Sequence, residues 1–482
     1  MNEEKLKSQM TSGMIWKFAE RFVAQGVSFV VSMVLARILM PEDYGAVAII
    51  NLFITIADVF LSSGLNTSLI QKKDADDLDF STIFYLNLGL SLVLYLILFL
   101  TAPFIAKAYD MPILNSAIRV FALRLPVSAF QIIQVAYISK KMQFKKFFLA
   151  TIVGTVLSAI VGIVMAIKGM GVWALIGQYL TNTVVDAIML WATVKWTPKK
   201  IFSFKAAIPL IQYSWKVMMT DLIGTLCNNL GSFIIGAKYN SADLAYYTKG
   251  NQLPQLFRTN IYTTLISVLF PGISAVNDDM IAVKKITRKS VRIMAYIVFP
   301  ISLGLMVAGD TIVKVLFTEK WLPMLPYVYV TCVETIISVP ATIALQPIKA
   351  VGRSDLMLKF EIIKKVFFIV STIVAMNFGV FAIALTVPAN TLLDLIINAN
   401  INKKLINYSF FEELSDCLAA LILSLIMAVV VAFIGKIEFN IYIKVVIQIM
   451  VGGLCYAGLS YLTRNKEFSY ILNVGMKHFK KA

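Results

Sequence analysis

The sequence predicts an all-α integral membrane protein with about fourteen spanning helices. Hydrophobic residues make up 59% of the 482 residues and charged residues only 15%, which leaves too little polar surface to cover a soluble protein of this length. Apolar runs of about 20 residues recur along the chain, and a helix needs this length to cross the hydrocarbon layer. The runs are continuously apolar, without the alternation typical of a membrane β-barrel.

The apolar runs form three groups in chain order. The first group predicts helices at 14–39, 44–69, 82–106, 117–138, 147–167 and 171–193. The second predicts helices at 209–236, 244–275, 291–316, 323–347, 357–377 and 379–400, and two more at 414–434 and 441–463 follow. The loops between these runs are too short to hold a folded domain, so the function must lie among the helices.

Lysine and arginine gather in alternate loops, and this bias predicts the orientation. With the N-terminus inside, the cytoplasmic loops and tails hold about 29 Lys and Arg, against about nine on the opposite side. We therefore expect both termini in the cytoplasm. The net charge of +17 comes largely from such patches, for example "SKKMQFKK", so no nucleic acid partner is expected.

Metal, cofactor and enzymatic chemistry find no support in the sequence. The four cysteines lie far apart inside apolar runs, and the one histidine, His478, lies in the polar C-terminal tail. The chain contains no GxxxxGK[ST] phosphate-binding loop, which argues against direct ATP coupling. A membrane polymerase or ligase needs acid/base groups on a sizeable loop, which is missing here. We expect no metal site, no cofactor and no enzyme.

An internal repeat predicts two lobes. The run "GVWALIGQYLTNTVVDAIM" from Gly171 and the run "GVFAIALTVPANTLLDLII" from Gly379 share seven of nineteen positions, including Asp186 and Asp394. Six helices per repeat is an even number, so both lobes have one orientation and enclose a cleft. The expected division is a first lobe at 1–205, a second lobe at 206–404, and two C-terminal helices with the tail at 405–482.

Polar residues recur along one face of several predicted spans. The first span carries Arg21, Gln25, Ser28 and Ser32, and the seventh carries Asp221, Thr225, Asn228 and Ser232. Equivalent positions carry opposite charges, Arg21 against Asp221 and Asp58 against Arg258. In the fourth and tenth spans, Arg124 and Glu334 match loosely in the same way.

A charge that faces lipid at mid-depth costs roughly 2.5–3.5 kcal/mol even on a lenient scale. The polar faces therefore predict a hydrated, partly cationic cavity between the lobes. The alternative for any single charge is a structural pair that holds two helices together, and for Asp186 and Asp394 we favour this structural role.

The N-terminal stretch resembles a known family. The elements "W-x4-R", "LAR-x-L-x-P-x-DYG", "SSGL" and "LIQKK" are similar to the opening of polysaccharide flippases in the multidrug/oligosaccharidyl-lipid/polysaccharide transporter superfamily. Further on, "AYYTKGNQLPQLFRTNI", "VLFPGIS" and "VLFTEKWLPMLPYVYVTC" resemble the branch of the colanic-acid and teichuronic-acid exporters. The resemblance implies two lobes as in multidrug and toxin extrusion (MATE) transporters, and alternating access in the bacterial inner membrane.

The resemblance also implies a cargo, an undecaprenyl-diphosphate oligosaccharide moved to the outer leaflet for surface polysaccharide synthesis. The expected cavity residues for its anionic headgroup are Arg21, Arg124, Arg258, Gln25 and Asn228. The candidate sites for coupling to H⁺ or Na⁺ are Glu20, Asp58, Asp221 and Glu334. Further partners would be membrane lipids and polysaccharide polymerase or assembly proteins. The alternatives are a cation-coupled multidrug antiporter of the same superfamily and a non-transporting scaffold.

Overall fold

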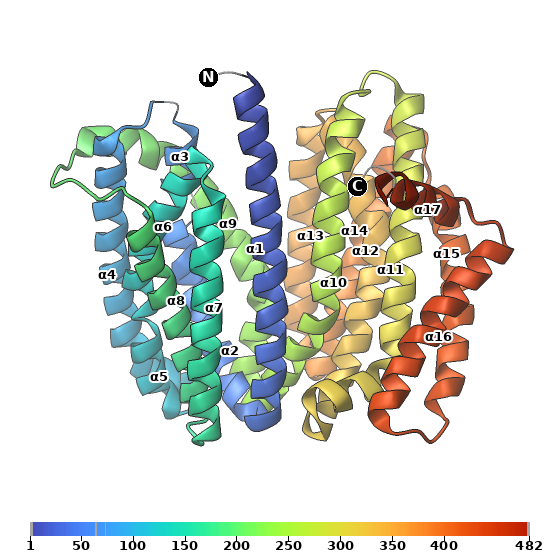
Figure 1. The fold of residues 1–482 in the computed structure, drawn as a ribbon, viewed down its shortest axis with the longest axis horizontal. Helices are drawn as coiled ribbons and strands as arrows, with labels where there is room; N and C mark the ends of the chain where they lie inside the picture. Colours follow the sequence, from blue (N-terminus) through green and yellow to red (C-terminus); the bar gives the residue numbers. More distant parts are fainter. Residues whose placement is uncertain (1–2, 63–64, 73, 480–482) are drawn as a thin grey trace. The chain divides into compact units, whose positions relative to one another are not determined.

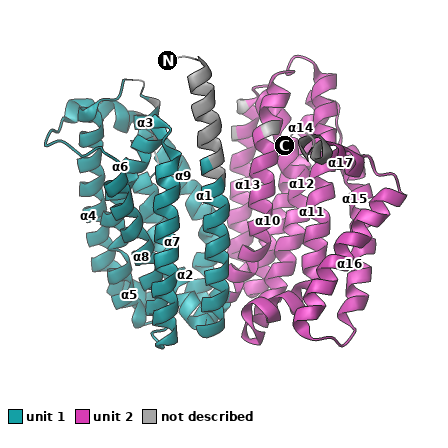
Figure 2. Ribbon diagram, viewed as in Figure 1, with its two compact units in different colours: residues 1–245 teal, residues 246–482 magenta. Residues whose placement is uncertain are grey.

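The computed structural model describes residues 3–62, 65–72 and 74–479 (Figure 1). It divides into two compact units, residues 1–245 and residues 246–482 (Figure 2). The first unit contains α1 (Glu3–Ile38), α2 (Pro41–Ser62), α3 (Leu65–Gln71), α4 (Asp77–Ala108), α5 (Ile113–Phe121), α6 (Arg124–Lys141), α7 (Phe144–Ile167), α8 (Val172–Thr193) and α9 (Phe204–Lys238).

The chain passes from the first unit to the second within α10 (Ser241–Ser274). The second unit continues with α11 (Met280–Phe317), the 3-10 helix η1 (Glu319–Met324), α12 (Leu325–Ala350), α13 (Ser354–Ala375), α14 (Val380–Leu405), α15 (Phe410–Gly435), α16 (Ile441–Leu462) and α17 (Lys466–Phe479).

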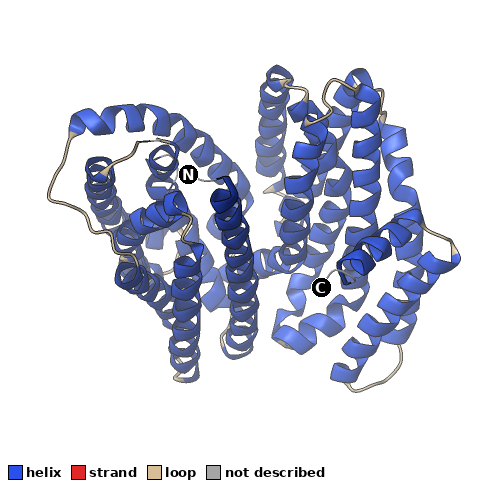
Figure 3. Ribbon diagram, turned by 45° about the horizontal axis from the view of Figure 1, so that its top comes forward, coloured by secondary structure: helices blue, strands red, loops and turns tan. Residues whose placement is uncertain are grey.

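The described residues form helices and short connections, without any strand (Figure 3). Ten helical segments of the described chain are long and apolar enough to cross a membrane. The other predicted spans fall on α8, α9, α10 and α13, which carry more polar and charged residues. The all-α membrane fold is therefore confirmed, and the expected number of fourteen spans is consistent with it.

Two predicted spans differ from the helices observed. The span expected at 117–138 is divided into α5 and α6, because Pro126 has no N–H to donate to the carbonyl oxygen of Ala122. The span expected at 44–69 is too long, since α2 ends at Ser62 and a separate short helix, α3, begins at Leu65. The short helices η1 and α17 add to the predicted set.

The compact units do not follow the repeat. The sequence places α9 at the start of the second lobe, whereas α9 packs against α2, α3 and α4 within the first unit. By its contacts α9 belongs to the first unit, whereas by sequence similarity it begins the second repeat. The lobe boundaries at 205 and 404 stay a prediction.

Large apolar side chains cover the outward faces of the helices. Phe104 in α4, Phe411 in α15 and Leu454 in α16 are 74%, 80% and 69% exposed. Exposed apolar surface on this scale is unfavourable in water and favourable in hydrocarbon. The helices thus have the surface expected of a multi-span membrane protein.

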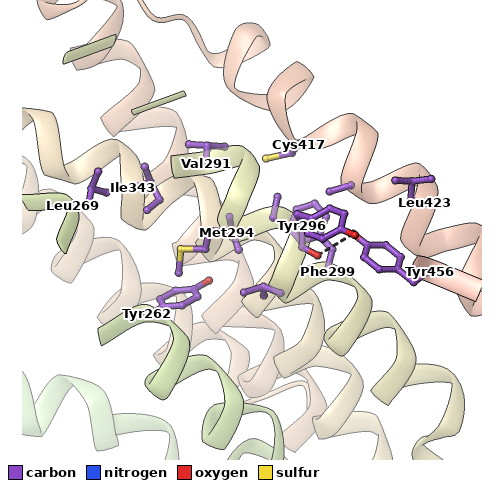
Figure 4. Close-up of a cluster of buried hydrophobic side chains, with 14 of the residues drawn as sticks. Tyr262, Leu269, Val291, Met294, Tyr296, Phe299, Ile343, Cys417, Leu423 and Tyr456 are labelled. Atoms are coloured by element: carbon purple, nitrogen blue, oxygen red, sulfur yellow. Dashed lines mark hydrogen bonds between the residues drawn. The ribbon is translucent and has the colours of Figure 1, made fainter. Parts of the chain in front are cut away.

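The core of the second unit combines apolar packing with satisfied hydroxyl groups (Figure 4). Tyr296 on α11 donates to the Ser460 hydroxyl at 2.8 Å, and Tyr456 on α16 donates to the Tyr296 carbonyl at 2.9 Å. Tyr262 on α10 donates to the Thr335 carbonyl at 3.1 Å. Since a buried hydroxyl without a partner is costly, these bonds fix how α10, α11, α12 and α16 pack.

An ionic network joins the first turns of α11 and α15. Arg288 donates to both carboxylate oxygens of Asp416, at 2.7 and 2.9 Å, and Arg292 donates to its Oδ1 at 2.8 and 2.6 Å. The Tyr408 hydroxyl donates to Oδ2 at 3.0 Å. The Asp416 side chain is only 2% exposed, so its charge depends on these donors.

We expect Asp416→Asn to lower the stability of the purified protein by about 1–3 kcal/mol, because two guanidinium groups lose their carboxylate. The measurement is the melting temperature in detergent. The control is Asp310→Asn, which removes an ion pair with Lys314 that is 53% exposed on the aspartate side and should cost less than about 1 kcal/mol. Equal melting temperatures for the two variants would contradict the prediction.

Candidate functional site

In the second unit, an arginine–glutamate pair lies among three helices. Arg258 on α10 donates to Glu334 on α12 in a short, charge-assisted hydrogen bond. The hydroxyl of Thr391 on α14 donates to the other carboxylate oxygen at 3.4 Å. Glu334 is 8% exposed and Arg258 is 25% exposed, so the arginine is the more accessible partner. It also lines a small cavity with Pro254 and Phe257.

The first unit has a matching pair with the charges exchanged. Arg124, at the start of α6, lies 3.1 Å from the carboxylate of Asp58 on α2, and each side chain is 28% exposed. In chain order, the second predicted span carries the acid and the fourth the base. In the second unit, the corresponding spans, α10 and α12, carry Arg258 and Glu334, the base and the acid.

The sequence predicted opposite charges at these equivalent positions, but it did not predict which residues would meet. The structure brings Asp58 to Arg124 and Arg258 to Glu334, each pair within one unit. The loose match between Arg124 and Glu334 was the signal that could have found the pairs. The acid and the base have exchanged places between the two units, so each pair stays neutral. Low-dielectric surroundings require this neutrality, because an unpaired charge is costly there.

A second pair of equivalent positions holds Asp186 on α8 and Asp394 on α14. Beside Asp394 lies Lys364 on α13, which is 6% exposed, with its Nζ 3.6 Å from the Asp394 carboxylate and 3.3 Å from the Asn398 side chain. The sequence reasoning missed Lys364, because it continues a run of charges at the start of a predicted span. The structural role expected for Asp394 agrees with this contact.

The first unit carries no such lysine at the matching place. Counting from the starts of α7 and α13, Lys364 corresponds to Gly154, and a Cβ at Gly154 would come within 1.9 Å of the Asp186 carboxylate. The Oδ1 atom of Asp186 is buried and accepts no hydrogen bond from the described residues. Hence Asp186 occupies the space that a side chain at 154 would need, and it forms no ion pair with the residues that the structure describes.

The other predicted site residues lie on α1 and α9 of the first unit. Arg21, Asp221 and Asn228 are exposed, while Glu20 and Gln25 are half-buried. Arg21 and Asp221 form no ion pair with any residue that the structure describes, which leaves both charges available to solvent or ligand. The structure does not join them to the pairs above.

The described residues contain no group of three His, Cys, Asp or Glu side chains placed to hold a metal ion. The polar groups that the helices do gather are arginine–carboxylate pairs and amides. Such groups can bind an anion at the arginine, or a proton or monovalent cation at the carboxylate. Both are binding functions.

Comparison with known proteins gives consistent matches along the chain. Residues 34–326 match the family model described as "Polysaccharide biosynthesis protein". The chain is 22% identical to the succinoglycan biosynthesis transport protein ExoT of Rhizobium meliloti (strain 1021), over 98% of this chain and 97% of that one. It is 24% identical to the lipopolysaccharide biosynthesis protein WzxC of Escherichia coli (strain K12), over 82% and 80% of the two chains.

Among solved structures, the lipid II flippase MurJ in its inward closed conformation matches with a TM-score of 0.77 and 13% identity, over 94% of this chain and 99% of that chain. An inward-facing multidrug resistance MATE family transporter of the MOP superfamily matches with a TM-score of 0.60 and 14% identity, over 79% and 94%. Both likenesses show the fold, and the all-α, MATE-like fold that the resemblance implied is thereby confirmed.

We expect Arg258→Ala and Glu334→Ala each to destabilise the protein, and the double variant to lose less than the sum of the two. Arg258→Ala leaves the buried Glu334 without its counter-charge, Glu334→Ala leaves Arg258 without one, and the coupling should be about 0.5–3 kcal/mol. The same double-mutant cycle on Asp58 and Arg124 should give a smaller coupling, because Asp58 is 28% exposed and Glu334 only 8%. The melting temperatures of the purified single and double variants measure the stability losses for both pairs. If the losses of Arg258→Ala and Glu334→Ala simply added in the double variant, the pairing would be refuted.

Proposed function

The chain belongs to the family of polysaccharide biosynthesis proteins, and from this premise we propose that it is a flippase for a lipid-linked glycan repeat unit. It would move the unit from the cytoplasmic to the outer leaflet of the bacterial cytoplasmic membrane, for surface polysaccharide synthesis. The observation that carries the proposal is Arg258, an arginine held among spanning helices with a quarter of its side chain accessible. An accessible arginine inside a membrane fits an anionic cargo.

A flippase must lower the cost of moving a charged headgroup through hydrocarbon. A diphosphate that carries sugars loses its hydration there, and arginine replaces part of it because the guanidinium can donate two parallel hydrogen bonds to phosphate oxygens. Arg258 and Arg124 are proposed to release their carboxylates and bind the diphosphate instead. Arg21, Gln25 and Asn228 are proposed to line the path. Alternating access between two lobes would then expose the site to each side in turn.

Exchange of the arginine from its carboxylate to a phosphate offers a way to couple transport to an ion gradient. When a phosphate takes Arg258 from Glu334, the freed carboxylate lies in a site only 8% exposed, where an uncompensated charge is costly. Uptake of H⁺ or Na⁺ by Glu334, and likewise by Asp58, would offset that cost. The exposed Asp221 and the half-buried Glu20 are further candidates for ion uptake. Coupling through these four carboxylates is part of the proposal.

The cation-coupled multidrug antiporter is the weaker candidate. Its cargo is cationic, and the base of each ion pair would repel it from the site. The MATE fold is shared, yet the matching family model and the curated relatives carry names from polysaccharide, succinoglycan and lipopolysaccharide biosynthesis. Both lines of support favour a glycan flippase. Polysaccharide polymerase or assembly proteins are its proposed partners.

The charges at the two ends of the second unit support the proposed orientation. One end holds the first turns of α11 and the last turns of α14, with cations such as Lys285, Lys289, Lys403 and Lys404. The opposite end, between α15 and α16, carries Lys436 beside Glu438. Because cytoplasmic loops carry the excess of Lys and Arg, we place the first end, and with it α17, in the cytoplasm, and the bias along the whole chain places the N-terminus there as well.

The transport proposal is tested by complementation of a strain that lacks its own flippase for the same glycan. We expect the wild-type protein to restore surface polysaccharide and Arg258→Ala to reduce export roughly tenfold to hundredfold, since a charge-assisted hydrogen bond contributes about 1.5–3 kcal/mol. Lys314→Ala, at a half-exposed ion pair, is the control and should export normally at matched expression.

The double variant Arg258→Ala/Glu334→Ala separates function from folding. It removes both charges together, so it should fold better than either single variant and still fail to export. Normal export by the double variant would reduce the pair to a structural role. Normal surface polysaccharide after deletion of the gene from its native strain, with no second flippase present, would refute the flippase proposal itself.

The orientation is tested with single cysteines in a variant whose four native cysteines are replaced. We expect a membrane-impermeant maleimide to label Lys436→Cys in spheroplasts and to leave Lys403→Cys unlabelled until the membrane is permeabilised. Both positions are exposed, so accessibility within the protein does not separate them. The reverse labelling pattern would invert the proposed topology.

A further inference from the structure

A basic groove lies on the second unit, where α17 lies across α11 instead of continuing α16 (Figure 1). The groove lies between the first turns of α11 and the start of α17 and encloses about 540 Å³. Six cationic side chains line it: Lys284, Lys285, Arg288, Lys289, Arg292 and Lys466. We call it the α11–α17 groove.

Three of these cations are fixed by carboxylates of α15. Arg288 and Arg292 share Asp416, and Lys284 lies 3.0 Å from Glu412. Glu412 in turn closes a capping box with Ser409 at the first turn of α15. One wall of the groove is therefore a rigid set of charges, held in place before any ligand arrives.

The other three cations have no carboxylate within ion-pair distance in the described part of the chain. These are Lys285, Lys289 and Lys466, and only one acidic side chain, Glu467, lines the groove with them. Lys289 lies over the ring of Tyr470, 3.8 Å from its centroid, which holds the ammonium group at the groove. With Glu412 and Asp416 included, six cations face three carboxylates, so the groove keeps an excess of three positive charges.

The groove lies at the depth of lipid headgroups. The 38 residues of α11 extend over roughly 57 Å at 1.5 Å per residue, well beyond the roughly 30 Å of hydrocarbon, so its first turns reach the interface. Ile281 is 82% exposed beside the groove, and Tyr470 of α17 is 43% exposed. Charged residues next to exposed apolar ones on a short amphipathic helix are typical of a helix lying in the interface.

We propose that the α11–α17 groove binds the phosphate headgroup of an anionic membrane phospholipid, with the acyl chains beside the exposed apolar residues. Phosphate oxygens accept hydrogen bonds from several ammonium groups at once, and basic pockets at the ends of spanning helices attract anionic headgroups. The bound lipid would neutralise the three unpaired lysines and hold α17 against α11. This inference is independent of the transported cargo.

A lipid-linked glycan also carries phosphate, in its diphosphate, and is therefore a second candidate ligand for the groove. The test therefore uses native mass spectrometry of the full-length protein with four separate probes. They are phosphatidylglycerol, phosphatidylcholine, undecaprenyl diphosphate and a poly-glutamate peptide. Wild type is compared with Lys285→Gln/Lys289→Gln/Lys466→Gln, which spares the cations bound to Asp416 and Glu412. The matched control, Lys349→Gln/Lys403→Gln/Lys404→Gln, loses the same charge at exposed positions outside the groove.

We expect wild type to bind phosphatidylglycerol in preference to phosphatidylcholine, the groove variant to lose at least tenfold in affinity, and the control variant less than threefold. Equal losses in both variants would overturn the proposal, because general surface charge would then explain binding. A loss of at least tenfold in the affinity for undecaprenyl diphosphate in the groove variant, with phosphatidylglycerol binding unchanged, would assign the groove to the cargo, and the same pattern for the peptide would assign it to a protein. Equal binding of phosphatidylcholine would also overturn it. Matching melting temperatures for the two triple variants without lipid show that folding is not the cause.

Discussion

The cost of an uncompensated charge in hydrocarbon governs this structure. Arg258 and Glu334 meet in the second unit, and Asp58 and Arg124 meet in the first, because none of them has enough water to remain alone. Each pair joins helices that are distant in sequence, so the constraint that neutralises the charges also fixes the packing of the unit. A ligand that offers an alternative counter-charge therefore acts on the packing as well.

The exchange of signs between the units has a functional consequence. Each unit keeps a neutral pair of its own, but the carboxylate of the second unit is much less exposed than that of the first, so the two pairs respond differently to an anion. Glu334 is the more buried carboxylate, so release of its arginine carries the larger cost. A phosphate that pairs with Arg258 would thus bring a proton or cation to the same place, which links cargo and ion through one equilibrium.

The positions of Asp186 and Asp394 illustrate how the two units diverged in detail. The same sequence motif places an aspartate next to a buried lysine in one unit and next to a glycine in the other. Lys364 compensates its aspartate, whereas Gly154 only makes room for one. At the cytoplasmic end proposed for the second unit, Asp416 and Glu412 compensate three cations of α11, and the cations that they leave uncompensated line the α11–α17 groove, for which we propose a lipid ligand.

The membrane fold could be predicted from the sequence alone, since composition and run length leave such a chain no other way to satisfy the hydrogen bonds of its backbone. The sequence also determined the repeat and the opposite charges at 58 and 258, because helical periodicity and alignment are local properties. The folded structure was needed to show that Asp58 meets Arg124, that Arg258 meets Glu334, and that Pro126 divides a span. Those contacts join residues some 66 to 76 positions apart, and the distance between such residues depends on how whole helices pack. The groove between α11 and α17 was equally hidden, because its charges come from segments that a linear pattern cannot bring together.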